Sequence, residues 1–357
     1  MGGCRARLES VRLTVDLDRA EIQSVLSLYH IDDLTDYGLV RTELFSTTYW
    51  VKALEEKYFL RVSLRRRFTD MVFEKDLLAY LRSQELSVPS FVENVASGAF
   101  TPWSSRGRYV TLFKFVEGRA LGQFQLDSEH TKQIGDFLGR FHCLGDNFSP
   151  RKAKRDLLEI LQKEIHRVQG RLSEEPGRAN LTDAVKRLEG ELAAQNSRSL
   201  QGPSGLHHGS LSITAAHFLR DKLMLVRDFS RSSHERFTLD LAIAINSWCW
   251  DVSSRQRGGP AGLYSPARLK AFLAAYTVHR PLGRTDYLQL ADDLRLTALA
   301  TAIHRIKNYE TSEESDDLFE DYRHYTARLE ALENKRAIEL LEMTGLVIKS
   351  ETKGPTA

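Results

Sequence analysis

Three stretches in the second half of the chain decide the fold. They read Leu206-His207-His208-Gly209-Ser210-Leu211-Ser212-Ile213-Thr214-Ala215, then Leu223-Met224-Leu225-Val226-Arg227-Asp228-Phe229, then Thr238-Leu239-Asp240-Leu241-Ala242-Ile243-Ala244-Ile245-Asn246-Ser247-Trp248-Cys249. The pattern predicts a turn, a short apolar strand that ends in an acidic residue, a polar loop and an apolar helix. Phosphoryl transfer needs such a frame, because it requires a base that orients the acceptor hydroxyl and polar groups that hold Mg²⁺ on the phosphates.

These stretches resemble the homoserine kinase branch of the aminoglycoside phosphotransferase family, which shares the protein-kinase architecture. The family reads H-G-D-L-x-x-x-N, then I-D-F, then Y-D-L-A-I-x-x-N-x-W-C. The second and third patterns are kept almost intact here as Asp228-Phe229 and Asp240 to Cys249. In the first pattern, Ser210 stands at the position of the base Asp and Ala215 at that of the metal-binding Asn.

The resemblance covers roughly residues 12 to 335 and implies a two-lobed α+β fold like that of protein kinases. A small lobe with an antiparallel sheet is expected over residues 1–115 and a large helical lobe over 116–345. Residues 346–357 are expected to form a disordered tail. In the small lobe we predict a helix over 17–30, and strands over 38–44, 47–53, 57–62 and 108–115, with Glu55-Glu56 as the turn between the second and third strands. Helices of the large lobe are expected over 134–142, 266–276, 286–309 and 316–343, with two more within 152–197.

The resemblance places nucleotide-binding groups in the small lobe. Arg61 occupies a strand position where related kinases have a phosphate-contacting Lys, and Glu74 is its expected ion-pair partner. The alternative is a strand-surface Arg61 that only pairs with a carboxylate. Adenine is expected to bond to the backbone between Phe113 and Phe115. Arg65-Arg66-Arg67 reads as a solvated loop, or alternatively as a patch for phosphate or an acidic ligand.

The turn that covers the phosphates in the family departs from its pattern. Aligned on Tyr49, the residues that match this turn are Glu43, Phe45, Ser46 and Thr48. The turn has no glycine, so the backbone is less able to approach a phosphate.

The catalytic positions are Ser210, His208 and Asp228. His208 has a structural role in the family, where it holds the loop by hydrogen bonds. Ser210 cannot act as a base near neutral pH, and Asp228 is the one clear metal-holding side chain, since Ala215 supplies no oxygen. Hydrated Mg²⁺ commonly needs only one or two protein carboxylates. ATP and Mg²⁺ are therefore expected to bind weakly or not at all.

Three further histidines can be interpreted from their positions in the sequence. We interpret His142 as a packed helix residue and His207 as a cap on the preceding strand, and we place His234 in the loop after Asp228. A hydrolase-like triad of Ser210, His234 and Asp228 is an alternative, but the kinase-like frame gives no reason for that geometry.

Composition narrows the class of protein. The 357 residues include 42% hydrophobic and 27% charged residues, which is ordinary for a globular chain. The formal net charge of +2 argues neither for nor against a nucleic-acid partner, and we predict none. No run approaches the roughly 18 apolar residues of a membrane span. Cys143 and Cys249 lie in apolar helical contexts typical of buried thiols, and the start of the chain lacks the apolar core of a signal peptide, so we predict a cytoplasmic protein.

Two interpretations of function follow. The first, which we favour, is a degenerate kinase, or pseudokinase, that binds a small-molecule or nucleotide ligand in the interlobe cleft, or regulates a protein partner. The second is a slow or repurposed ATP-dependent phosphotransferase that acts on homoserine or another amino alcohol and relies on Arg61 and Asp228. Positioning and electrostatics supply most of phosphoryl-transfer catalysis, so loss of the base alone does not exclude turnover. In both cases Asp228 is predicted to face Arg61 across the cleft.

Overall fold

The computed structural model confirms the two-lobed α+β fold. It describes residues 17–43, 46–63, 66–103, 108–150, 152, 157–174, 179–196, 202–253, 262–309, 322–333 and 336–346. The chain divides into two compact units, the first made of residues 1–79 and 89–116 and the second of residues 80–88 and 117–357. The segment Tyr80–Val88, which sequence analysis assigned to the small lobe, groups with the second unit. Within that unit the Tyr80 hydroxyl donates to the Leu144 carbonyl oxygen at 3.0 Å.

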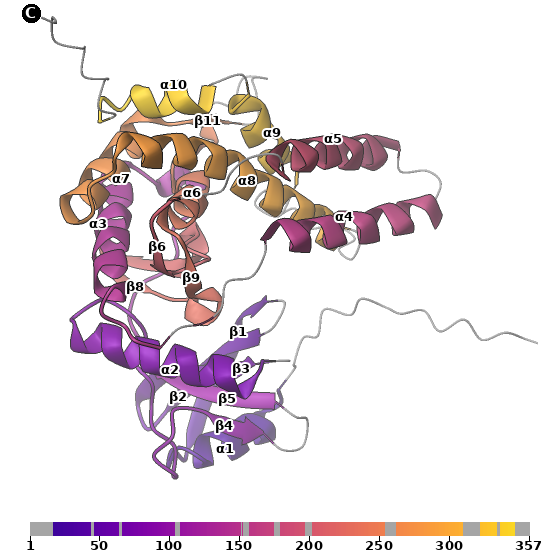
Figure 1. The fold of residues 1–357 in the computed structure, drawn as a ribbon. Coiled ribbons are helices and arrows are strands. Elements are labelled where there is room, and N and C mark those ends of the chain that lie inside the picture. Colours follow the sequence, from indigo (N-terminus) through magenta and orange to yellow (C-terminus); the bar gives the residue numbers. More distant parts are fainter. Residues whose placement is uncertain are drawn as a thin grey trace, which may run out of the picture. The chain divides into compact units, whose positions relative to one another are not determined.

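The first unit is a five-stranded antiparallel sheet with two helices (Figure 1). The strand order is β1-β2-β3-β5-β4, with β1 at Leu34–Glu43, β2 at Ser46–Ala53, β3 at Glu56–Ser63, β4 at Thr101–Trp103 and β5 at Arg108–Lys114. Helix α1, Arg19–Ser27, starts with a capping box in which the Asp18 carboxylate accepts from the N–H of Glu21 at 2.8 Å. Helix α2 spans Phe68–Ser83. Apolar side chains from α1 and strands β1, β2, β3 and β5 form the core of this unit.

The turn between β2 and β3 lies one residue earlier than predicted. Ala53 pairs with Glu56, so Leu54 and Glu55 form the turn and Glu56 belongs to β3. Leu54 and Glu55 both have positive φ, 49° and 64°. Two left-handed residues are what a tight two-residue hairpin requires, because its twist then matches that of the strands. Neither residue is glycine, so composition did not reveal the position of this turn.

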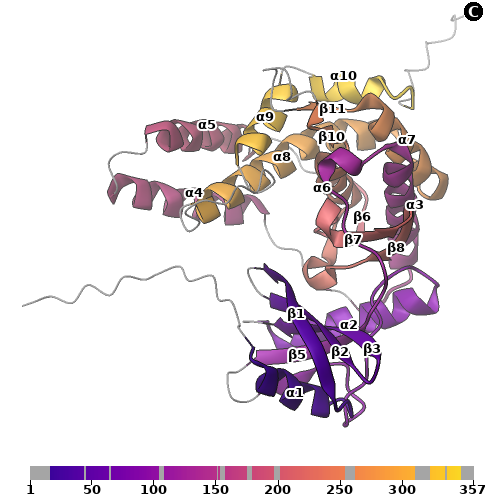
Figure 2. The same cartoon turned by 180° about the vertical axis from the view of Figure 1, so that it is seen from behind.

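The second unit consists mainly of helices (Figures 1 and 2). They are α3 Ser128–Gly145, α4 Leu157–Glu174, α5 Ala179–Asn196, α6 Phe237–Trp248, α7 Pro266–His279, α8 Arg284–Tyr309, α9 Arg323–Ala331 and α10 Arg336–Glu342. Three small antiparallel pairs join them: β6 Ser204–His207 with β9 Ser233–Arg236, β7 Ala216–Leu219 with β8 Lys222–Val226, and β10 Trp250–Asp251 with β11 Leu263–Tyr264. None of the helices described is long and apolar enough to cross a membrane.

The single helix predicted over residues 316–343 is wrong in its described part. Helix α9 ends at Ala331, and α10 starts at Arg336. Leu332, which follows Ala331, is buried. Its N–H donates to the carbonyl oxygens of Arg328 and Leu329, and this tight turn ends α9. Residues 316–321 and the predicted tail from residue 347 onward lie outside the described part.

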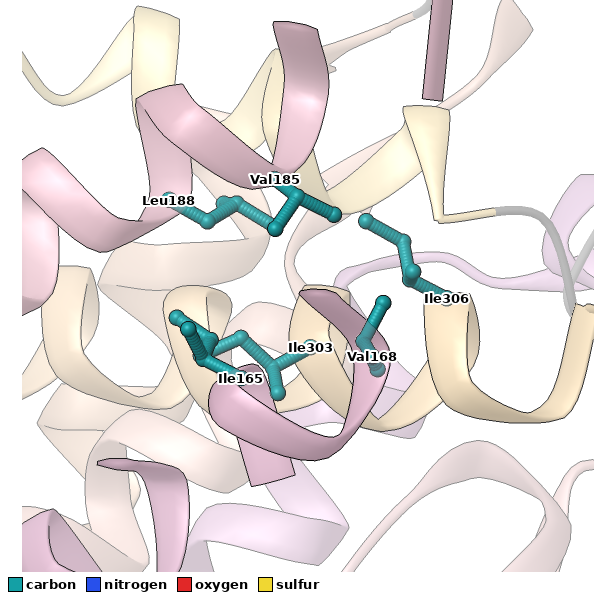
Figure 3. Close-up of a pocket in the computed structure, with 6 residues that line it drawn as sticks. All are labelled: Ile165, Val168, Val185, Leu188, Ile303 and Ile306. Atoms are coloured by element: carbon teal, nitrogen blue, oxygen red, sulfur yellow. The ribbon is translucent and has the colours of Figure 1, made fainter. Parts of the chain in front are cut away.

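Helices α4 and α5 form a hairpin that packs its apolar side chains against α8 and α9. A small pocket lies between α4, α5 and α8 (Figure 3). The residues that line it are all aliphatic: Ile165, Val168, Val185, Leu188, Ile303 and Ile306. Since none of them carries a polar group that would orient a ligand, we interpret this pocket as part of the core.

Candidate active site

The loop after β6 is held by His208. Its ring is fully buried, and Nε2 lies 2.9 Å from the carbonyl oxygen of Arg227. The other ring nitrogen, Nδ1, accepts from the N–H of Ser210 at 3.3 Å. Burial lowers the pKa of His208, although Asp240 and Asp228 oppose this shift. A neutral ring with its proton on Nε2 satisfies both bonds, so His208 ties Ser210 to the segment before Asp228.

Asp240 on α6 is the anchor of the same loop. Its carboxylate has no exposed surface and accepts from the N–H groups of His208 at 2.6 Å and Gly209 at 2.9 Å. It also contacts Nε2 of His142 at 3.1 Å. Burial alone would raise the pKa of Asp240, but the hydrogen bond from His142 and the nearby His207 ring hold it well below its ordinary value. An ionised carboxylate therefore fixes two consecutive backbone amides at the start of the loop.

His142 is the packed helix residue that the sequence suggested. It lies on α3, and its Nδ1 accepts from the Tyr276 hydroxyl at 2.8 Å, while Nε2 faces Asp240. Burial lowers the pKa of His142, against the effect of Asp240. A neutral His142 that donates through Nε2 and accepts through Nδ1 satisfies both neighbours. This arrangement links α3, α6 and α7 behind the loop.

Ser210 is turned into the loop. Its hydroxyl donates to the main-chain oxygen of Asp228 at 2.8 Å. Asp228 itself adopts a left-handed backbone conformation, with φ 73° and ψ 43°, at the start of the short helix Phe229–Arg231. A non-glycine residue in this region is uncommon and is held there by its surroundings. The structure thus brings the Ser210 side chain and the Asp228 backbone together.

Ala215 sits in a tightly bonded segment. It ends the short helix Ile213–Ala215, is fully buried, and accepts the N–H of Arg227 on its carbonyl oxygen at 2.8 Å. The guanidinium of Arg227 donates to the Thr214 carbonyl oxygen at 2.8 Å. The backbone of this loop is therefore well ordered by hydrogen bonds, while the side chain at 215 is a methyl group without a metal ligand.

His207 and His234 lie on neighbouring strands. His207 ends β6, and its Nε2 bonds to the Ser233 hydroxyl at 2.9 Å, whereas Nδ1 is 3.7 Å from Asp240 Oδ1. His234 was predicted in a loop, but it belongs to β9 and pairs with Leu206. The pairing of β6 with β9 joins segments about 30 residues apart and explains the difference. The Ser210 hydroxyl donates to the main-chain oxygen of Asp228, which is not the arrangement that a triad with His234 would need.

The candidate nucleotide-binding residues of the first unit include a compact charge cluster. Arg61 on β3 donates to Glu74 on α2 through both terminal nitrogens, at 2.9 and 2.8 Å, which is the ion pair expected from the sequence. Arg66 also pairs with Glu74 Oε2 and donates to the Asp70 carbonyl oxygen at 3.2 Å. The Arg61 guanidinium lies 4.9 Å from the ring centroid of Phe113.

Arg66 is therefore not the solvated loop residue that the arginine run suggested. Only 9% of its side chain is exposed, compared with 71% for Arg67, which pairs with Asp70 at the surface. Burial would raise the pKa of Glu74, but the two arginines hold it at about 2. Arg65 lies outside the described residues.

The remaining predicted nucleotide residues line the same sheet. Ser46 begins β2 opposite Glu43 and is buried. Phe115 follows β5 and packs against Phe59, with ring centroids 4.9 Å apart. The N–H of Lys114 donates to the Ser90 carbonyl oxygen at 2.8 Å, so this amide is not available to an adenine ring. Leu44, Phe45 and the side chain of Glu43 lie outside the described part.

Sequence reasoning missed two residues of the site. Asp240 was quoted only as part of a matching segment, although three groups bond to its carboxylate. Its position at the start of an apolar helix, directly after a strand, was the available signal, because a charged residue buried there needs partners. Arg66 was interpreted as part of the run Arg65-Arg66-Arg67. It lies eight residues before Glu74 and ahead of the start of α2, and this spacing gives no pattern that singles it out.

Solved structures of small-molecule kinases share this fold. An amicoumacin kinase, solved in complex with AMP-PNP and Ca²⁺, matches 93% of this chain and 96% of its own with a TM-score of 0.63 at 14% identity. A microcompartment-associated aminopropanol kinase matches 93% of this chain and all of its own with a TM-score of 0.60 at 17% identity. Similarity at this level defines a protein-kinase-like fold.

Sequence comparison then gives the family. The homoserine kinase of Xanthobacter autotrophicus is 25% identical over 297 residues, which cover 82% of this chain and 87% of that protein. That of Cupriavidus necator is 27% identical over 293 residues, or 79% and 82% of the two chains. The model of the phosphotransferase enzyme family matches residues 43–282. The chain belongs to the phosphotransferase enzyme family, as the resemblance predicted.

Proposed function

We propose that this protein is a nucleotide-binding member of its family that has lost most of its phosphotransferase activity and acts as a ligand-binding or regulatory protein. The observation that carries this proposal is the hydrogen bond from the Ser210 hydroxyl to the Asp228 main-chain oxygen. A serine hydroxyl does not take up a proton near neutral pH, and this one is directed into the loop. Loss of a general base typically slows a reaction by about 10²–10⁴-fold.

The loss of the Asn at position 215 supports the same proposal, because Asn at this position holds the metal in the family. Ala215 supplies no metal ligand. Asp228 and the phosphates of a bound nucleotide would therefore hold the Mg²⁺ ion. The ion would offset part of the phosphate charge. Such a donor set suits Mg²⁺, which often keeps several waters. We infer that nucleotide binding by this protein depends less on Mg²⁺ than it does in an active relative.

The first test is turnover. Assays of the wild-type protein with ATP, Mg²⁺ and homoserine, followed by other amino alcohols, should give a rate below about 0.1 s⁻¹, roughly tenfold under the usual range of about 1–100 s⁻¹ for kinases. Turnover above about 0.1 s⁻¹, within about tenfold of the usual range, would refute the loss of activity. Calorimetric titration of the same protein with ATP, with chelator and with Mg²⁺, tests binding separately.

The second test restores the base. Ser210→Asp, alone and with Ala215→Asn, should raise turnover by about 10–100-fold, since it returns a carboxylate that can orient the acceptor hydroxyl. Ser212→Asp is the matched control, because Ser212 lies on the same loop and its hydroxyl bonds to the Thr214 hydroxyl at 3.0 Å. It should leave turnover unchanged. An equal gain from Ser212→Asp would show that added charge, and not the base position, is responsible.

A slow phosphotransferase is the second candidate. It is favoured by one observation, the retention of Asp228 alongside the intact ion pair of Arg61 with Glu74. If this candidate is correct, the wild-type protein should show a low turnover that Asp228→Asn abolishes. Residual turnover that persists in Asp228→Asn would count against it.

A further inference from the structure

The structure brings a serine, a histidine and an aspartate together, but they are not the three residues that the sequence suggested. Strands β6 and β9 pair so that His207 and Ser233 stand directly opposite each other. Nε2 of His207 lies 2.9 Å from the Ser233 hydroxyl oxygen, and Nδ1 lies 3.7 Å from Oδ1 of Asp240. Asp240 comes from the first turn of α6. The three side chains therefore form a row from a buried carboxylate to a hydroxyl.

The charge of Asp240 determines which nitrogen of His207 carries the proton. The carboxylate is fully buried and ionised, so it can only accept hydrogen bonds. A separation of 3.7 Å is too long for a hydrogen bond, but the negative charge still favours the tautomer with its proton on the facing nitrogen, Nδ1. Nε2 then carries a lone pair and accepts the O–H of Ser233. A hydroxyl that donates to a histidine oriented in this way is an activated nucleophile.

We propose that Ser233 is a nucleophile that takes acyl groups from small activated esters, with His207 as its base and Asp240 orienting His207. The Ser233 oxygen forms a bond to the ester carbonyl carbon while its proton moves to Nε2 of His207. The bond from that carbon to the alcohol oxygen then breaks, and the alcohol leaves with the proton from His207. Water later hydrolyses the acyl-serine to the carboxylic acid and restores the hydroxyl. This activity goes beyond the proposed function and uses neither nucleotide nor metal.

The nucleophile can be reached from solvent, whereas its base is sheltered. Ser233 is partly exposed. The side chains of His207 and Asp240 are 9% and 0% exposed. Charges interact more strongly in such a low-dielectric environment than in water, so the carboxylate stabilises the imidazolium that forms when His207 takes the proton.

The backbone around Ser233 limits the rate. Serine hydrolases also direct N–H groups at the developing oxyanion, and loss of one such donor costs about 10²–10³ in rate. The N–H groups on either side of Ser233 are already used: that of Ser232 donates to the Phe229 carbonyl oxygen at 3.0 Å, and that of His234 to the Lys152 carbonyl oxygen at 3.3 Å. Hydrolysis should therefore be slow. Because p-nitrophenolate is a much better leaving group than a serine alkoxide, an acyl-serine formed from a p-nitrophenyl ester should accumulate.

The test is treatment of the full chain with p-nitrophenyl acetate, in excess chelator and without nucleotide, followed by peptide mapping by mass spectrometry. The acetyl group should be found on Ser233. His207→Gln should lower the rate of acetylation there by at least about 100-fold, since a positioned base typically contributes about 10²–10⁴. Ser230→Ala is the matched control, because Ser230 lies in the same loop and is also partly exposed. It should leave the rate at Ser233 unchanged.

Three results would overturn the proposal. They are acetylation of lysines without acetylation of Ser233, equal acetylation of Ser230 and Ser233, and an unchanged rate in folded His207→Gln. Since the assay contains no ATP, none of these results bears on the proposed function. Conversely, a wild-type protein that fails to bind ATP can still be acetylated at Ser233.

A second pair of variants covers the case in which His207→Gln does not fold. Ser233→Cys and Ser230→Cys each place one thiol in the loop and leave His207 in position. A thiol beside a histidine has a lowered pKa and reacts as the thiolate. The thiol introduced by Ser233→Cys should therefore react with iodoacetamide near neutral pH at least about tenfold faster than that introduced by Ser230→Cys. Equal rates would show that His207 does not activate this position, which also overturns the proposal.

Discussion

At the scale of single residues, Asp240 fixes the backbone of the loop after β6, although it has no assigned role in the chemistry of the site. Its ionised carboxylate accepts two backbone amides of the loop and faces His142. Asp240→Asn keeps the shape but turns an amide N–H₂ toward groups that are themselves donors. Hydrogen bonds to a charged group contribute about 1.5–3 kcal/mol each, so the free energy of unfolding should fall by at least about 2 kcal/mol. Urea denaturation measures this change.

Asp136 provides the matched control for Asp240. It also pairs with a histidine, His279, at 2.7 Å, but half of its side chain is exposed. Asp136→Asn should therefore lower the free energy of unfolding by less than about 1 kcal/mol. Similar losses from Asp240→Asn and Asp136→Asn would mean that the buried carboxylate does not anchor the loop.

At the scale of elements, helices α3 and α7 pack so closely that Gly135 and Gly139 of α3 leave no room for a side chain. A Cβ on Gly135 would lie 2.2 Å from the Phe272 carbonyl oxygen of α7, and one on Gly139 would lie 2.9 Å from that of Tyr276. Gly135→Ala forces the two helix backbones apart and should cost at least about 2 kcal/mol of unfolding free energy. Gly170 on α4 has nothing within 4 Å of such a Cβ. Gly170→Ala should instead stabilise the protein by about 0.5–1 kcal/mol.

Opposite signs for these two substitutions in thermal or urea denaturation would separate backbone contact from helix propensity. Destabilisation by both would contradict the packing argument, because the gain of propensity at Gly170 would then be absent. Gly135→Ala also tests whether the hydrogen bond between His142 on α3 and Tyr276 on α7 depends on the close approach of the two helices.

The sequence predicted the helices and strands better than the turns and breaks that separate them. The order of turn, strand, loop and apolar helix around Asp228 followed from apolar patterning and from the resemblance, and so did the ion pair of Arg61 with Glu74. The turn at Leu54-Glu55 and the break after Ala331 did not, because neither contains a glycine or proline. Partners distant in sequence were also hidden: Asp240 meets His142 across 98 positions. That Asp228 faces Arg61 stays a prediction.

At the scale of the whole molecule, buried neutral histidines make stability depend on pH. His142 and His208 are fully buried, and burial lowers the pKa of each from an ordinary value of 6.5. In the unfolded chain both regain that ordinary value, so below about pH 6.5 the unfolded state binds protons that the folded state does not. Their contribution to stability is thus complete above pH 6.5 and is lost as the pH falls further. Glu74, with a pKa of about 2 against 4.5, adds a second loss below pH 4.5.

Each histidine should lower the free energy of unfolding by up to about 1.4 kcal/mol per pH unit below pH 6.5. Urea denaturation at pH 8, 7, 6 and 5 should therefore show little change between pH 8 and 7 and a steep fall between pH 6 and 5. His142→Gln keeps a donor for Asp240 and an acceptor for Tyr276 but cannot take up a proton. Its slope between pH 6 and 5 should be shallower by about one proton. A slope identical to that of the wild type would mean that His142 is already protonated in the folded protein, with Asp240 as its ion-pair partner.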